Sequence, residues 1–128
     1  MVTGAGSGIG KAIATLFARN GAHVLLTDIH YENIETVTEQ IKKHHGIASC
    51  YTADISQSPD VSKLFTYTFQ RYGRLDILVN NAGIMDDFTP AGELSDELWT
   101  RVIGTNLTGA FLTSRAALLP FTNQGSGI

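Results

Sequence analysis

The sequence has few of the features that mark secreted, metal-binding or membrane proteins. It holds one cysteine, Cys50, so no disulfide can form within the chain and no cysteine cluster can bind a metal. The N-terminus lacks the basic region followed by an apolar region that marks a signal peptide. No apolar run approaches the ~20 residues that a membrane span needs. We therefore expect a cytoplasmic protein.

Charge is also scarce. Charged residues make up 16% of the chain and the net charge is −3, without any block of like charges, which disfavours nucleic acid or an acidic membrane as a partner. His44 and His45 are adjacent and do not share a helix face, which favours a solvated helix end. Asp86-Asp87 has no third ligand in view, so we predict no metal site. The 128 residues, 43% of them hydrophobic, suit one globular domain.

Short apolar runs alternate with helical patterns along the chain. Residues 23–28, 48–54 and 76–80 have the continuous apolar character of parallel strands buried on both faces, and 1–3 would be the end of another strand. This alternation predicts an α/β fold with right-handed crossovers. The expected helices carry these apolar positions: Ile9, Ile13, Leu16 and Phe17; Ile34, Val37 and Ile41; Val61, Leu64, Phe65 and Phe69; and, in a helix over 95–119, Trp99, Val102, Ile103, Ala110 and Phe111.

The ends of the last helix have recognisable signals. Ser95 can cap its first turn, where Asp96 and Glu97 suit the positive end of the helix dipole. Pro120 is expected to end it.

Four glycines occur within the eight residues Thr3-Gly4-Ala5-Gly6-Ser7-Gly8-Ile9-Gly10. They follow a predicted strand and open a predicted helix, where Gly4 permits a tight turn, Gly8 lets the backbone approach a pyrophosphate, and Gly10 lets the helix pack on the sheet. The free amides of the helix start can then hold the phosphate charge. A plain flexible turn is the alternative. A P-loop is excluded, because Lys11-Ala12 lacks the required hydroxyl.

Asp28 ends the second apolar run, twenty residues after Gly8. A carboxylate there can accept hydrogen bonds from the adenosine ribose and would repel the 2′-phosphate of NADP. Neither Ser7 nor Ile29 offers a compensating positive charge. The sequence thus predicts NAD in preference to NADP, although a strand-end carboxylate without this role is the alternative.

With these residues placed, the chain resembles the short-chain dehydrogenase/reductase family over nearly its whole length. Thr3 to Gly10 fits the family's TGxxxGxG loop, and Asn80-Asn81-Ala82-Gly83 fits its NNAG motif. Asp54-Ile55 fits the acidic pair that meets the adenine ring, and Asn106 matches the helical asparagine of the family's active site.

The resemblance implies a three-layer Rossmann-type parallel sheet of strand order 3-2-1-4, and a partial NAD(P)-binding domain over 1–128. Asn81, Ala82 and Gly83 would lie along the cofactor near its nicotinamide half, or simply form a tight strand exit. Asn106 would hold a water in a proton relay, or merely bond to a carbonyl. The residues expected at the cofactor are Gly4, Ser7, Gly8, Ile9, Gly10, Asp28, Asp54, Ile55, Asn81, Ala82 and Gly83.

The match stops at the catalytic residues. The family's hydride transfer between nicotinamide and an alcohol or carbonyl carbon uses a tyrosine, a lysine four residues later that lowers the tyrosine pKa, and a serine. No tyrosine of this chain is followed by a lysine four residues later. The residue at that position is Glu35 after Tyr31, Ile55 after Tyr51, Arg71 after Tyr67 and Asp76 after Tyr72. We expect a sequence truncated at both ends and inactive alone.

Three interpretations stay open. The first is the NAD-binding portion of an alcohol or ketone oxidoreductase. The second is a non-catalytic module that binds NAD or pairs with a longer relative. The third is a gene fragment without function. The resemblance also implies self-association through the 95–119 helix, whereas the substrate and the direction of reaction cannot be read from these residues.

Overall fold

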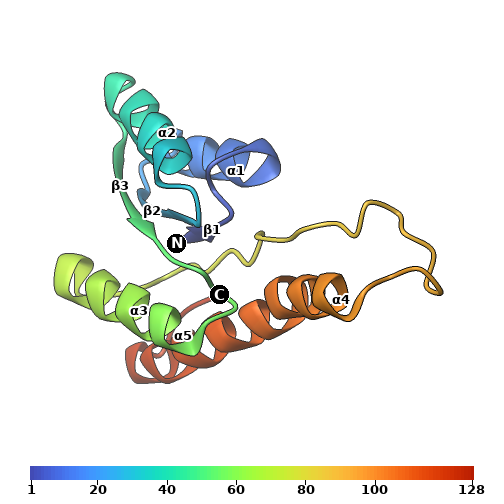
Figure 1. The fold of residues 1–128 in the computed structure, drawn as a ribbon. Coiled ribbons are helices and arrows are strands. Elements are labelled where there is room, and N and C mark those ends of the chain that lie inside the picture. The colour runs from blue at the N-terminus through green and yellow to red at the C-terminus, as the bar shows by residue number, and fades with distance from the viewer.

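A three-stranded parallel sheet lies between two layers of helices in the computed structural model, which describes all 128 residues (Figure 1). The strands β1 (Val2–Thr3), β2 (His23–Asp28) and β3 (Ile47–Thr52) lie in the order β1-β2-β3. Helices α1 (Gly8–Arg19) and α2 (Tyr31–Lys43) cover one face, and α3 (Ser58–Tyr72) and α5 (Ala110–Gln124) cover the other. The predicted three-layer α/β fold is confirmed. No helix has the length and apolar character that crossing a membrane requires.

The segment 76–80 takes the fourth position in the sheet, but as a single bridge between Val2 and Val79 rather than a regular strand. Val79 accepts a hydrogen bond from the Thr3 N–H (3.0 Å) and donates one to the Met1 carbonyl (2.9 Å). On its other edge, the Ile128 N–H donates to the Asp76 carbonyl (3.0 Å). The order 3-2-1-4 therefore holds, and the pairing is short because β1 has only two residues.

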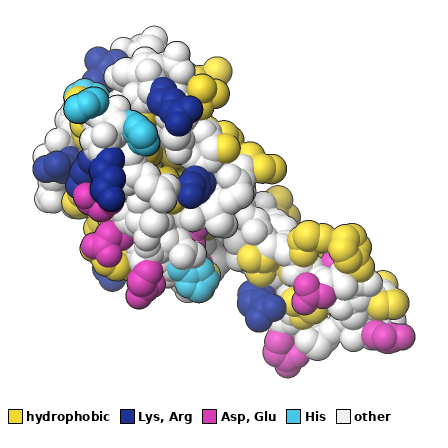
Figure 2. Space-filling view, turned by 90° about the horizontal axis from the view of Figure 1, so that it is seen from above, with side chains coloured by type: hydrophobic (Ala, Val, Ile, Leu, Met, Phe, Trp, Pro, Cys, Tyr) yellow, Lys and Arg dark blue, Asp and Glu magenta, His cyan; other side chains and the backbone are white.

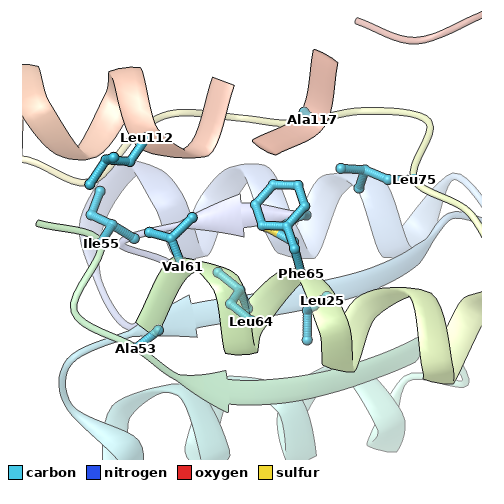
Figure 3. Close-up of a cluster of buried hydrophobic side chains, with 10 residues drawn as sticks. Leu25, Ala53, Ile55, Val61, Leu64, Phe65, Leu75, Leu112 and Ala117 are labelled. Carbon is cyan, nitrogen blue, oxygen red and sulfur yellow. The ribbon is translucent and has the colours of Figure 1, made fainter. Parts of the chain in front are cut away.

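Two hydrophobic cores flank the sheet. In the core between the sheet and α3 and α5, Leu112 and Ala117 of α5 lie over Val61 and Phe65 of α3, with Leu25 of β2 on the sheet side (Figure 3). The second core lies under α1 and α2. The predicted apolar stripes of α2 and α3 are confirmed, since their buried members include Ile34, Val37, Ile41, Val61, Leu64 and Phe65.

The predicted stripe of α1 is confirmed for Ile13 and Phe17, which are partly buried against the second core, and wrong for Ile9 and Leu16. Ile9 and Leu16 are 74% and 58% exposed, and the buried face consists of Gly10, Ala14 and Ala18. These small residues recur every four positions, so they share one helix face. Because they have little or no side chain, the helix backbone comes close to the sheet, and Ile9 and Leu16 are left exposed.

The single helix predicted over 95–119 is divided. It consists of α4 (Asp96–Ile103), a π-helical turn η1 (Gly104–Gly109) and α5, and Pro120 lies inside α5 rather than ending it. The last turn is held from outside, because the Gln124 side chain donates to the Leu75 carbonyl (2.7 Å) and accepts from the Leu75 N–H (3.2 Å). These contacts offset the backbone hydrogen bond that the proline lacks.

The two aromatic residues expected in the core of this segment are not buried there. Trp99 and Phe111 are each 56% exposed, and α4 has no fully buried residue. The cap was predicted correctly, since the Ser95 hydroxyl accepts a hydrogen bond from the Leu98 N–H (3.2 Å).

Stability of the 128-residue chain is expected to fall as the pH drops from 8 to 6. Burial lowers the pKa of the Met1 α-amino group from 8.0 to about 6, although the negative charge of Asp76 acts to raise it. Between these values the unfolded chain takes up a proton that the folded chain does not, so acidification removes about 3 kcal/mol of unfolding free energy. Urea unfolding from pH 5.5 to 8.5 at constant ionic strength measures this loss. The N-acetylated chain is the control, and an equal loss there would contradict the assignment to Met1.

Candidate functional site

A cleft of about 1370 Å³ opens at the carboxyl ends of the strands, bounded by the strand–helix turns on one side and α4 on the other. In an open parallel α/β sheet, this edge is where ligands bind. Of the residues predicted at a cofactor, those that line the cleft are Gly4, Ser7, Gly8, Ile9, Asp28, Asp54, Ile55, Asn81, Ala82 and Gly83. Gly10 and Asn106 lie outside its lining.

The glycine loop has a different spatial constraint at each of its three key positions. Gly4 has a φ of +62°, and a Cβ there would lie 2.8 Å from the Cα of Ala82. Gly8 has a φ of +51°, but a Cβ would have no atom within 4 Å, because it faces open space. A Cβ on Gly10 would lie 2.2 Å from the Gly4 carbonyl oxygen. Gly4 and Gly10 thus permit close packing, and Gly8 leaves the cleft accessible.

The first turn of α1 presents unpaired donors beside this space. Ser7 occupies the N-cap position but makes no side-chain capping bond. The first hydrogen bond of the turn runs from the Lys11 N–H to the Ser7 carbonyl (3.0 Å), which leaves the amides of Gly8, Ile9 and Gly10 without an intrahelical acceptor. Amide donors at the positive end of a helix dipole fit a phosphate group.

The hydroxyl of Thr3 links β1 to residues 79–82, where the chain leaves the fourth strand position of the sheet. Its Oγ1 accepts hydrogen bonds from the N–H groups of Asn81 and Ala82 (3.0 Å each) and donates to the Val79 carbonyl (3.3 Å). The Asn81 amide donates back to the carbonyls of Thr3 (2.9 Å) and Gly4 (3.2 Å). Residues 81–83 are therefore held directly against the glycine loop.

Asp28 lines the cleft at the end of β2. One carboxylate oxygen accepts from the Gly6 N–H (3.1 Å) and the other from the His30 N–H (3.2 Å). Each oxygen of an ionised carboxylate can accept more than one hydrogen bond, so both retain capacity for a ligand.

The turn after β3 brings Asp54 and Ile55 to the same cleft. The Asp54 carboxylate accepts from both the N–H (2.9 Å) and the hydroxyl (2.7 Å) of Ser56, which closes the turn. Ile55 is only 5% exposed and packs against Gly109 of η1, where a Cβ would lie 2.7 Å from the Ile55 Cγ1. Little of the Ile55 side chain is thus available to a ligand.

Asn106 bonds to the chain beyond the NNAG motif. Its amide donates to the Ile84 carbonyl (2.9 Å), and its Oδ1 accepts from the Ile84 N–H (2.8 Å). Both the oxygen and the nitrogen of the side-chain amide are therefore hydrogen-bonded to the backbone of Ile84. The contact fixes η1 against the cleft, since Ile84 is part of the lining.

Sequence reasoning missed the α4 wall and the turn after Asp28. These lining residues include His30, Asp96, Glu97, Thr100 and Arg101. The pKa of the Glu97 carboxyl is lowered mainly by a hydrogen bond from its own backbone and secondly by one from the Ser95 side chain. His30 follows Asp28 by two positions and could have been noticed, whereas no local pattern indicated that α4 faces the strand ends.

The model of a protein family described as short chain dehydrogenase matches residues 1–128 of this chain. The chain belongs to the short-chain dehydrogenase/reductase family. It is similar to the short chain dehydrogenase/reductase dpchG of Colletotrichum higginsianum, with 38% identity over 118 residues, 92% of this chain and 44% of that protein. It is also 33% identical to 3beta-hydroxysteroid dehydrogenase 2 of Eggerthella lenta over 99% of this chain and 49% of that protein.

Solved structures of short-chain dehydrogenases share the fold. A metagenomic short-chain oxidoreductase in complex with NADP matches with a TM-score of 0.95 and 33% identity, over 98% of this chain and 57% of that one. A variant of the actinorhodin polyketide ketoreductase with NADPH matches with a TM-score of 0.94 and 35% identity, over 98% of this chain and 49% of that one. The family prediction is confirmed, and the chain spans about half the length of the curated relatives it matches.

Replacing Thr3 with valine is expected to destabilise the protein. Valine has nearly the same shape but would leave the partly buried N–H groups of Asn81 and Ala82 without their acceptor. A fully buried unsatisfied group costs about 1–3 kcal/mol, and these two are only partly buried, so we expect a loss of about 2–4 kcal/mol in urea unfolding. Thr36→Val is the matched control, because that exposed hydroxyl bonds only to the Glu32 carbonyl of its own helix. Similar losses in the two variants would show that the Thr3 hydroxyl has no special role.

Proposed function

We propose that this chain binds a nicotinamide dinucleotide in the cleft, as the nucleotide-binding portion of an oxidoreductase that transfers hydride between nicotinamide and an alcohol or carbonyl carbon. One observation carries the proposal: the unpaired amides of the α1 first turn and the Asp28 carboxylate line the same cleft at the carboxyl edge of the sheet. This pairing of a phosphate cradle with a ribose acceptor is the arrangement by which Rossmann folds hold dinucleotides.

In the proposed complex, each part of the lining has a separate task. The amides of Gly8 and Ile9 hold the pyrophosphate, and Ser7 lies beside them. Asp28 accepts hydrogen bonds from the adenosine ribose, and the turn at Asp54 and Ile55 lies beside the adenine. Ala82 and Gly83, with Asn81, extend along the nicotinamide half. The bound cofactor would supply the hydride acceptor or donor.

None of the four tyrosines of this chain lines the cleft, so none is assigned as the general acid or base of the proposed reaction. The Tyr31 hydroxyl donates to the Glu35 carboxylate (2.6 Å), and this hydrogen bond raises the Tyr31 pKa. A neighbouring lysine would lower it. The Tyr72 hydroxyl pairs with the Ser49 hydroxyl (2.6 Å) across the α3–β3 contact. Hydride transfer therefore needs catalytic residues beyond these 128, as the half-length match to the relatives also suggests.

The preference for NAD over NADP rests on the charge of the lining. Its acidic residues are Asp28, Asp54, Asp96 and Glu97, against one guanidinium, Arg101, on the opposite wall. The two structural relatives described above carry NADP or NADPH, so the proposal depends on Asp28 rather than on the family. We also keep a cytoplasmic location as part of the proposal, since the one cysteine, Cys50, is free.

Asp28→Asn is expected to reduce the preference for NAD. The amide keeps the shape of the side chain but removes the charge that repels a 2′-phosphate and strengthens hydrogen bonds to the ribose. We expect the ratio of the NADP⁺ to the NAD⁺ dissociation constant to fall about tenfold, as the loss of one charged hydrogen bond predicts. Isothermal titration calorimetry measures both constants. Glu39→Gln, an exposed α2 residue outside the cleft, is the control. An unchanged ratio in Asp28→Asn would rule out this account of cofactor choice.

A pairing function is the second candidate, and a stripe of exposed apolar residues favours it. Trp99, Leu107, Phe111 and Leu118 are all more than half exposed and lie at near-helical spacing along α4, η1 and α5. The guanidinium of Arg115 lies over the Phe111 ring, 4.9 Å from its centroid. Exposed apolar patches are typical of protein contact sites. We propose that this stripe joins two copies of the chain, or one copy and a longer relative.

Trp99→Asp combined with Phe111→Asp is expected to abolish this association. Charges placed on both rings would have to be buried unpaired in the interface. Sedimentation velocity should give a dimer for the unmodified chain and a monomer for the double variant. Leu16→Asp, on the exposed side of α1, is the control and should stay dimeric. A monomeric unmodified chain across the micromolar range would refute self-association through this stripe.

A further inference from the structure

Gly6, the fourth glycine of the loop, is explained neither by its backbone conformation nor by the family motif. Its φ lies outside the positive range that favours glycine, unlike those of Gly4 and Gly8. Residue 6 is also one of the positions that the TGxxxGxG pattern leaves open. Its surroundings exclude a side chain instead, because a Cβ on Gly6 would lie 2.7 Å from the Asn33 Cβ and 3.0 Å from the Asp28 Oδ2. Glycine is therefore required here by its neighbours.

These two neighbours lie on either side of the proposed ribose site. Asn33 is in the first turn of α2, and its Cβ is bonded directly to the helix backbone, so this atom cannot move without the helix. Asp28 ends β2, and its carboxylate accepts one hydrogen bond from the Gly6 N–H (3.1 Å) and one from the His30 N–H (3.2 Å). The missing side chain of Gly6 thus lets the glycine loop and the start of α2 hold the carboxylate together.

Backbone amides are the only groups that orient the Asp28 carboxylate. Asp28 takes part in none of the ion pairs of the chain, and its side chain has no further hydrogen-bond donor. Figure 2 shows that the lobe carrying α4, the other wall of the cleft, has few cationic side chains. Gly6 itself lies outside the cleft lining, so any influence that it has on a ligand passes through Asp28.

We propose that Gly6 is a positioning residue for the adenosine ribose: without a side chain, its amide fixes the Asp28 carboxylate in the orientation that receives the 2′-hydroxyl. The inference rests on the proposed dinucleotide site, where the acidic residue after the second strand meets that hydroxyl. Each oxygen of the carboxylate keeps a free acceptor position for it. The pyrophosphate cradle is separate, because it consists of the amides of the α1 first turn.

A Cβ at residue 6 would keep the N–H group but change its position. Two unbonded carbon atoms do not pack at 2.7 Å, so the loop would move away from Asn33. The carboxylate would also have to turn, since one of its oxygens lies 3.0 Å from the same Cβ. Both shifts would separate the amide from Oδ2 and release the carboxylate from its orientation toward the ribose.

The test compares ADP with 2′-deoxy-ADP, which differ only in the hydroxyl that Asp28 would accept. Isothermal titration calorimetry of the full 128-residue chain gives both dissociation constants, and their ratio is the quantity compared. For the unmodified chain, 2′-deoxy-ADP should bind about tenfold more weakly, as loss of one hydrogen bond to a charged group predicts. In Gly6→Ala the ratio should fall to about two or less, because that hydrogen bond is already lost. A general loosening of the loop would weaken both nucleotides alike and leave the ratio unchanged.

Gly8→Ala is the matched control for strain in the loop. Its φ of +51° makes alanine unfavourable there, but its Cβ would have no atom within 4 Å. This variant should weaken both nucleotides and keep the ratio of the unmodified chain. Adding Asn33→Gly to Gly6→Ala removes the closer of the two contacts and should restore the ratio. If Gly6→Ala alone gives no cooperative urea transition, the added Asn33→Gly should restore folding and the ratio together.

The outcomes separate this inference from the proposed function. Equal ratios in the unmodified chain and Gly6→Ala, with ADP bound by both, would overturn the role of Gly6 alone. Failure of Asn33→Gly to restore the ratio would overturn it as well. If the unmodified chain binds neither ADP nor NAD⁺, the proposed function fails and this inference fails with it.

Discussion

The contact between Thr3 and residues 79–82 is the one on which the rest of the site depends. β1 has only two residues, so regular strand pairing can supply few hydrogen bonds to the segment beside it. The buried Thr3 hydroxyl adds three more, two of them to the amides of Asn81 and Ala82. Because Thr3 leads directly into the glycine loop, this hydroxyl also determines where the loop lies relative to the strand exit, and thus the shape of the cleft.

Close packing of α1 is the second requirement. Gly10, Ala14 and Ala18 let the helix approach the sheet, and the Gly4 carbonyl occupies the place that a side chain on Gly10 would take. The helix start is thereby held at the strand ends with its first amides unpaired. Ile9 and Leu16 are displaced outward by the same packing. The exposure of large apolar residues on α1 is thus a consequence of how the loop and helix meet.

The cleft has one end suited to a phosphate, and most of the charged residues in its lining are acidic. In the complex that we propose, the amides at the α1 start would attract a pyrophosphate through local dipoles, whereas Asp28 and Asp54 would disfavour an additional anion at the ribose end. The two effects act on different parts of one ligand, because the helix dipole falls off within a turn. If the proposed site is right, changes at the β2 end would alter the selectivity between closely related dinucleotides without loss of the phosphate cradle.

The sequence by itself determined the α/β class, the extent of β2, the buried positions of α2, and ten of the 23 residues that line the cleft. These features follow from local rules, since apolar runs, helix periodicity and glycine spacing act over neighbouring residues. It placed Ile13 and Phe17 of α1 in the core but missed the fully buried Gly10, Ala14 and Ala18, because small residues contribute little to an apolar pattern but permit the closest approach. Nor did it reveal that α5 continues past Pro120, since the Gln124 contacts with Leu75 join residues 49 positions apart. The α4 wall of the cleft and the Asn106 contact with Ile84 were likewise decided by tertiary structure. Each brings together backbone and side chains whose separation in the chain no local rule can bridge.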